Sequence, residues 1–110
     1  MHPGARQELL AAAARRLLEA VLESPAVTPA DLRRAAFDGD LDRHTEEPVT
    51  SYVAKVHDHA HRVTDADIAA LRDDGLSDDA IFELTVAAAL GAAHRRLVAG
   101  LAVLDRGGAP

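Results

Sequence analysis

The segment from Ser77 to Leu104, SDDAIFELTVAAALGAAHRRLVAGLAVL, decides the fold. Ser77 is a good N-cap, and the roughly 27 residues after it predict a helix of roughly 40 Å at 1.5 Å per residue. Between Leu84 and Ala93 this helix is apolar nearly all round, which is typical of a helix that is buried on every side. The other helices of the chain are too few and too short to enclose it, so we expect part of it to meet a second copy.

The same segment favours close packing of helices. The stretch AAALGAA, residues 87–93, presents a small-residue surface, and Gly91 lets another helix approach closely. Aromatic residues make up only 3% of the chain. The core must therefore be built from Leu, Val, Ile and Ala.

Two helices are predicted in the first part of the chain, over residues 5–24 and 29–38. The first ends at Ser24–Pro25, because the residue before a proline avoids the helical basin. The second has Thr28 as its N-cap, and Gly39 supplies a left-handed stop. Apolar positions recur at helical intervals on one face of the first helix, at Leu10, Ala13, Leu17 and Val21.

Two further helices follow a polar loop. Pro48 starts a helix that runs to Val63, and its buried stripe is carried by valines and Ala60. Thr64 then caps a short helix that Gly75 ends, with Asp67 in the acidic place of a capping box. No strand alternation is present, so the sequence predicts a single all-α domain, 1–110, of about five helices.

Composition excludes several classes of function. The chain has no cysteine, which removes disulfides, thiolate ligands and thiol redox chemistry. Its net charge is −6, so it lacks the basic footprint of a nucleic-acid binder. We interpret the pairs Arg15–Arg16, Arg33–Arg34 and Arg95–Arg96 as solvated helix flanks. With no signal core and no uninterrupted apolar span, we expect a cytoplasmic protein with no membrane partner and no cofactor.

The stretch HDHAH, His57–His61, holds three of the six histidines. On an unbroken helix His57 and His61 share one flank and His59 falls on the opposite one, so the three cannot converge on one ion. His57 and His61 could supply two metal ligands, but no spacing recommends a third. A solvated or interface flank is the favoured interpretation; the available third ligands are His44, Glu46, Glu47 and His94.

Tyr52, Lys55 and His59 occupy Y-x-x-K-x-x-x-H on one flank beside the buried stripe. An imidazole near an ammonium and a phenol could act as a general base with an acidic partner. These three residues are therefore the candidate catalytic group. The alternative is a lysine lying along the helix surface and a histidine in an ordinary surface hydrogen bond.

The second half of the chain, about residues 48–104, resembles the alkylhydroperoxidase-D-like, or carboxymuconolactone decarboxylase, superfamily. The most telling parts are VTDADIAALRDDGLSDDAIFELT and the AAALGAAHRRL that follows. The resemblance implies an all-helical subunit that forms a dimer, trimer or hexamer through the long Ala-rich helix. The family's redox members carry C-x-x-C-x-x-x-H, and this chain has no cysteine with which to perform that chemistry.

Two registers of the family motif are open. In one, Tyr52 and Lys55 stand in the cysteine places and His59 in the histidine place. In the other, the corresponding positions fall near Glu47, Thr50 and Ala54. The resemblance therefore implies either cysteine-independent acid–base chemistry on a small organic acid or lactone, or a non-catalytic oligomeric module with an accessory or regulatory role.

Overall fold

The computed structural model describes residues 3–41 and 47–107, and within these ranges the chain forms helices and no strand. The predicted all-α class, with a long C-terminal helix, is confirmed. Five α-helices and one short 3₁₀ helix follow one another along the chain: α1 (Pro3–Glu23), α2 (Ala30–Asp38), α3 (Val49–His59), η1 (Ala60–Arg62), α4 (Asp65–Asp73) and α5 (Asp78–Gly107).

Most helix ends lie beside glycine or hydroxyl residues that favour the start or end of a helix. Gly39 and Gly75 follow α2 and α4 with φ of 74° and 96°, which a side chain would resist. Thr64 and Asp67 form a reciprocal capping box at the start of α4. The Ser77 hydroxyl accepts the Ala80 N–H at 3.1 Å and so caps α5.

The predicted cap at Thr28 is wrong. Pro29 stands directly before α2, and no side chain caps that helix. The Thr28 hydroxyl instead donates to Glu83 Oε1 at 2.6 Å. An N-cap hydroxyl accepts a backbone N–H, but here the charge-assisted hydrogen bond that Thr28 donates to the carboxylate turns its hydroxyl towards α5.

The helix predicted over residues 48–63 is shorter than expected. α3 ends at His59, whose φ of −145° and ψ of 53° lie outside the helical region, and η1 continues the chain. Val63 and Thr64 then take the extended backbone that precedes a capped helix. His61 therefore lies on η1, whereas His59 is the last residue of the α-helix that carries Tyr52 and Lys55.

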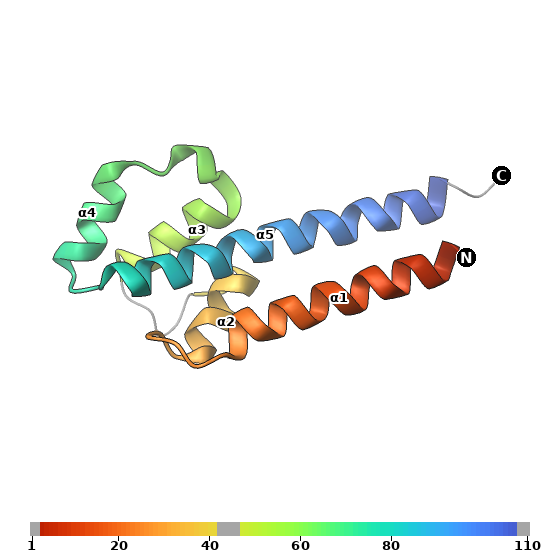
Figure 1. The fold of residues 1–110 in the computed structure, drawn as a ribbon. Coiled ribbons are helices and arrows are strands. Elements are labelled where there is room, and N and C mark those ends of the chain that lie inside the picture. The colour runs from red at the N-terminus through yellow and green to blue at the C-terminus, as the bar shows by residue number, and fades with distance from the viewer. Residues whose placement is uncertain (1–2, 42–46, 108–110) are drawn as a thin grey trace.

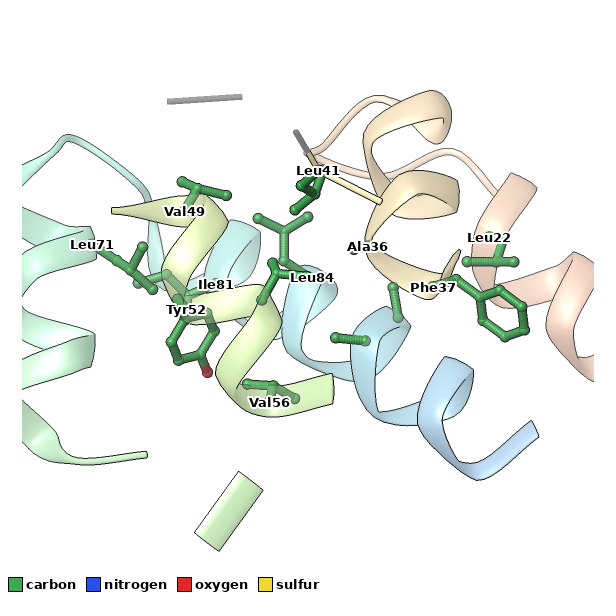
Figure 2. Close-up of a cluster of buried hydrophobic side chains, with 13 residues drawn as sticks. Leu22, Ala36, Phe37, Leu41, Val49, Tyr52, Val56, Leu71, Ile81 and Leu84 are labelled. Carbon is green, nitrogen blue, oxygen red and sulfur yellow. The ribbon is translucent and has the colours of Figure 1, made fainter. Parts of the chain in front are cut away.

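α5 is the axis of the molecule, and the other helices pack along it (Figure 1). α2 and α3 lie against its first half, α4 lies near its start, and α1 runs beside its second half. Figure 2 shows the core that forms where α2, α3 and α5 meet. Its larger buried members are Leu22, Phe37, Leu41, Val49, Tyr52, Val53, Val56, Leu71, Ile81 and Leu84.

Gly91 permits a close helix approach, as the sequence indicated, but the neighbour is the chain's own α2. A Cβ on Gly91 would lie 1.8 Å from the carbonyl oxygen of Phe37. No side chain fits in that space. The backbones of α2 and α5 are therefore in direct contact at this point.

Arg33 departs from the interpretation of the arginine pairs as solvated flanks. It is buried, with 3% of its surface exposed. Its guanidinium donates to Val21 O at 2.6 Å and to Ser24 O at 2.7 Å. It thus satisfies carbonyls at the end of α1, which otherwise have no partner within their helix.

Beyond this core, α1 and residues 94–107 of α5 extend side by side as a two-helix arm (Figure 1). The molecule measures 55 × 29 × 25 Å, and its radius of gyration of 16.3 Å exceeds the roughly 13 Å of a compact chain this long. Seven large apolar residues of the arm have about half or more of their surface exposed; these are Leu9, Leu10, Leu17, Leu97, Val98, Val103 and Leu104. By length and composition alone, α5 is one described helix that could cross a membrane.

Candidate functional site

Tyr52, the first member of the predicted catalytic group, is a core residue. Only 5% of it is exposed, and Figure 2 shows its ring among the buried side chains. Its hydroxyl lies 2.6 Å from Thr85 Oγ1, and that threonine hydroxyl donates to Ile81 O at 2.6 Å. Since the threonine proton is already used, Tyr52 donates, and it links α3 to α5.

Lys55 is paired with Asp67 across the turn between α3 and α4. Its Nζ lies 3.0 Å from both carboxylate oxygens. Asp67 also accepts the Thr64 N–H at 2.8 Å. That backbone hydrogen bond, followed by the one from Lys55, holds the pKa of Asp67 below its usual value.

His59 is exposed at the last residue of α3, with its ring 6.2 Å from that of His61. Four surface hollows of 160 to 300 Å³ lie along the helices, and none of these four is lined by Tyr52, Lys55 or His59. The three side chains therefore have separate surroundings in the described structure. Their joint role in acid–base chemistry stays a prediction.

The possible metal pair, His57 and His61, is split by the end of α3. His57 is buried and His61 is exposed on η1. Among residues 3–41 and 47–107, no group of three or more histidine, aspartate or glutamate side chains is placed to hold a metal ion. Of the possible third ligands, His44 and Glu46 lie outside the described residues, Glu47 is exposed, and the His94 ring packs on Phe37.

The sequence favoured a solvated or interface position for His57, but the structure places it inside the protein. Only 3% of it is exposed, and its Nδ1 lies 3.0 Å from Asp58 Oδ1. On the other side of the ring, Nε2 lies 3.5 Å from the guanidinium of Arg95 on α5. No spacing rule could find this contact, because the two residues are 38 positions apart.

The Asp58–His57–Arg95 group borders a hollow of about 300 Å³ between α2, α3 and α5. The hydrogen bond from His57 is the largest cause of the lowered pKa of Asp58. Asp58 is therefore a carboxylate near neutral pH. Such an ion holds an imidazole in one orientation, as carboxylates do beside catalytic or ligand-binding histidines.

Glu83 is a half-buried carboxylate on α5, and its role is structural. Its two oxygens accept hydrogen bonds from the Val27 N–H, the Thr28 N–H and the Thr28 hydroxyl at 2.6 to 3.0 Å. The Thr28 side chain is the largest cause of the lowered pKa of Glu83. The carboxylate fixes the loop between α1 and α2 on α5.

Comparisons of the chain with protein families, with curated proteins and with solved structures found no match.

Proposed function

We propose that this protein is a helical association module whose two-helix arm pairs with the arm of a second copy. The observation that carries the proposal is the row of exposed leucine and valine side chains on both helices of the arm. Large contiguous apolar surfaces mark sites of association. The separate surroundings of Tyr52, Lys55 and His59 support a role in assembly over one in catalysis.

The surface area supports this proposal. A folded monomer of 11.6 kDa exposes about 5,800 Å², whereas this chain exposes 7497 Å². The excess of about 1,700 Å² is larger than the roughly 800 Å² that one partner contributes to a standard interface. An interface of standard size would remove about half of this excess from each copy, so the exposed area leaves room for pairing of two arms.

The packing within the arm supports a helical partner. Hollows of about 190 and 160 Å³ flank the contact between α1 and α5, and both are lined by Leu18, His94 and Leu97. Side chains of a second arm would fill these hollows as knobs fill holes in a four-helix bundle. The partner is thus a copy of the same two helices.

Charge favours a second copy in water over a lipid bilayer as the partner. α1 carries exposed charged side chains along the arm at Arg6, Glu8, Arg15, Arg16 and Glu19. Charges within a membrane span cost several kcal/mol each, at about 2.5–3.5 kcal/mol near the centre. An arm pair in water leaves these charges on the outside.

The fold is also proposed to be that of a cysteine-free relative of the alkylhydroperoxidase-D-like superfamily. The support for this is the sequence stretch that ends in AAALGAAHRRL, together with the all-α architecture and its long last helix. An accessory or regulatory subunit would keep such a fold for assembly after losing the sulfur chemistry.

Sedimentation equilibrium over a wide concentration range tests the association. We expect the unaltered chain to form a dimer or a larger closed assembly. The double variant Leu10→Lys/Leu97→Lys should sediment as a single subunit while keeping its helical circular dichroism. Phe82→Lys is the matched control, because Phe82 is exposed on α5 outside the arm.

A single subunit for the unaltered chain up to millimolar concentration would overturn the proposal. So would an arm variant that assembles as well as the unaltered chain. Dissociation caused by Phe82→Lys alone would place the interface elsewhere on α5.

A further inference from the structure

The hollow between α2, α3 and α5 has one polar wall and one apolar wall. His57 and Arg95 form the polar side, and Phe37 and Val98 form much of the apolar side. Gly39 lies against the His57 ring, at a distance where a Cβ would be 3.3 Å from Cε1 and Nε2. The ring is therefore held between the end of α2 and the hollow.

The hydrogen bonds of His57 fix its tautomer. Asp58 is ionised and can only accept, so the Nδ1 atom of His57 must carry the proton that joins them. The guanidinium of Arg95 can only donate, and it faces Nε2 at 3.5 Å. A lone pair on Nε2 is thus directed towards Arg95 and the hollow, where it can accept a hydrogen bond.

The guanidinium of Arg95 has N–H groups that remain available to a ligand. Its contact with Nε2 is long for a hydrogen bond, and its other contact, with Asp58 Oδ1, measures 3.8 Å. Its side chain is 64% exposed. A guanidinium with free N–H groups at the edge of a hollow is suited to a carboxylate, which it can bind through two parallel hydrogen bonds.

The other charges around the hollow limit the ligand. Asp38 lies on its wall and Asp58 lies behind His57, so a second negative charge on the ligand would meet repulsion. About 300 Å³ is at the lower end of the range for small-molecule sites. The fitting ligand is a small molecule with one carboxylate, a hydrogen-bond donor and a short apolar part.

We propose that this hollow binds a small hydroxy acid, with its carboxylate on Arg95, its hydroxyl donating to His57 Nε2, and its carbon chain against Phe37 and Val98. Asp58 and Gly39 act as positioning residues for the imidazole. The site lies at the base of the arm and requires no second copy.

Titration with L-lactate, followed in ¹H–¹⁵N NMR spectra, tests the site. We expect saturable shifts in the amide signals of Gly91 and Val98 and in the ring nitrogen signals of His57. Propionate lacks the hydroxyl and should bind about threefold or more weakly, since one neutral hydrogen bond is lost. Inorganic phosphate tests the limit on charge and should bind more weakly than lactate.

Variants at two adjacent arginines separate a specific site from general attraction of anions. Arg95→Gln should weaken lactate binding about tenfold or more, because hydrogen bonds to a charged group are lost. Arg96→Gln removes a neighbouring exposed charge and should leave binding unchanged. The titration is repeated on Leu10→Lys/Leu97→Lys, so that a failure of arm pairing is distinguishable from a failure of ligand binding.

No saturable shift at high millimolar lactate would overturn the proposal. Equal binding of lactate and propionate would remove the role of His57. Equal losses in Arg95→Gln and Arg96→Gln, or tighter binding of phosphate than of lactate, would show that the hollow only attracts anions without selecting them.

Discussion

Glu83 shows how one polar residue in an apolar helix can hold a loop in place. Its carboxylate receives all three of its hydrogen bonds from Val27 and Thr28, which lie 55 to 56 positions earlier in the chain. We expect Glu83→Gln to lower the free energy of unfolding by about 1–2 kcal/mol, because charge-assisted hydrogen bonds become neutral ones. Urea denaturation measures this change.

Glu23→Gln is the matched control for that experiment. Glu23 pairs with Arg34 at 3.2 Å, but its side chain is 63% exposed. An exposed ion pair contributes little, so the loss should stay within about 0.5 kcal/mol. Equal losses in the two variants would contradict the role assigned to Glu83.

The lowered pKa of Glu83 gives this comparison a pH dependence. The folded state binds the proton of Glu83 less tightly than the unfolded state, whose pKa is near 4.5. The stabilisation is therefore fully present above that value and is lost as pH falls through the lower, folded pKa. The difference in stability between the unaltered chain and Glu83→Gln should be constant near neutral pH and shrink in acid.

Substitution of two histidines of the HDHAH stretch should change the free energy of unfolding by very different amounts. His57→Ala should cost about 2–4 kcal/mol, because it leaves a cavity and removes the partner of Asp58. His59→Ala should change the free energy of unfolding by less than about 0.5 kcal/mol, because His59 is exposed. Chemical denaturation of both variants measures the contrast.

The His59 variant also tests the predicted acid–base group. If Tyr52, Lys55 and His59 act together, His59→Ala should abolish turnover of any small organic acid or lactone that the protein converts. Unchanged turnover would end that assignment.

Unchanged stability of His57→Ala would instead contradict the burial of His57.

The sequence could not predict which residues of other helices the candidate side chains contact. Helical periodicity placed Lys55 beside the buried stripe, whereas Tyr52 is part of the core itself. Periodicity carries no information about what faces these residues from other elements. Thr85 and Asp67 are 33 and 12 positions away from them. The partners depend on how α3, α4 and α5 pack, which local spacing does not encode.

At the scale of elements, helix ends were predictable where the chemistry is local. Gly39, Gly75 and the Thr64–Asp67 box act within a few residues of their own helix, and all were predicted. The Thr28 cap failed because a distant carboxylate competes for its hydroxyl. The early end of α3 was missed; the chain turns there into η1, and Asp67 on α4 faces Lys55.

Two glycines of α5 offer a test of element packing. Gly91→Ala would press a methyl group into the Phe37 carbonyl, so α2 and α5 must separate at a cost of about 2–3 kcal/mol or more. A Cβ on Gly100 would meet nothing within 4 Å. Gly100→Ala should therefore be neutral or stabilise by up to about 1 kcal/mol through helix propensity.

Thermal unfolding of the two alanine variants makes this comparison directly. A folded Gly91→Ala protein with an unchanged melting temperature would contradict the direct contact between the two backbones. A large loss in Gly100→Ala, by contrast, would indicate that a second copy approaches α5 at that glycine.

At the scale of the whole molecule, the long apolar helix has two different environments. Its first half is buried by α2 and α3 of the same chain, with Leu84, Ala87 and Ala88 almost fully covered. Its second half passes into the arm, where α1 runs beside it. The sequence pointed to residues 84–93 as the part that one chain cannot enclose, whereas the exposed large apolar residues of the second half are Leu97, Val98, Val103 and Leu104.

This division predicts a stability that depends on concentration. If arms pair, assembly stabilises the folded state by mass action, so the melting temperature should rise as the protein is concentrated. The Leu10→Lys/Leu97→Lys variant should melt at one temperature at every concentration. Differential scanning calorimetry on both proteins measures this, and a concentration-independent melt of the unaltered chain would contradict arm pairing.

The start of α1 and the end of α5 lie at the same tip of the arm (Figure 1). Two arms could pair with their tips together or with their tips at opposite poles of a particle whose subunits are 55 Å long. A flexible ten-residue linker spans only about 18 Å on average. Covalent tandem copies joined by such a tether would therefore close into a single-chain dimer only in the first geometry, and would be driven to polymerise in the second.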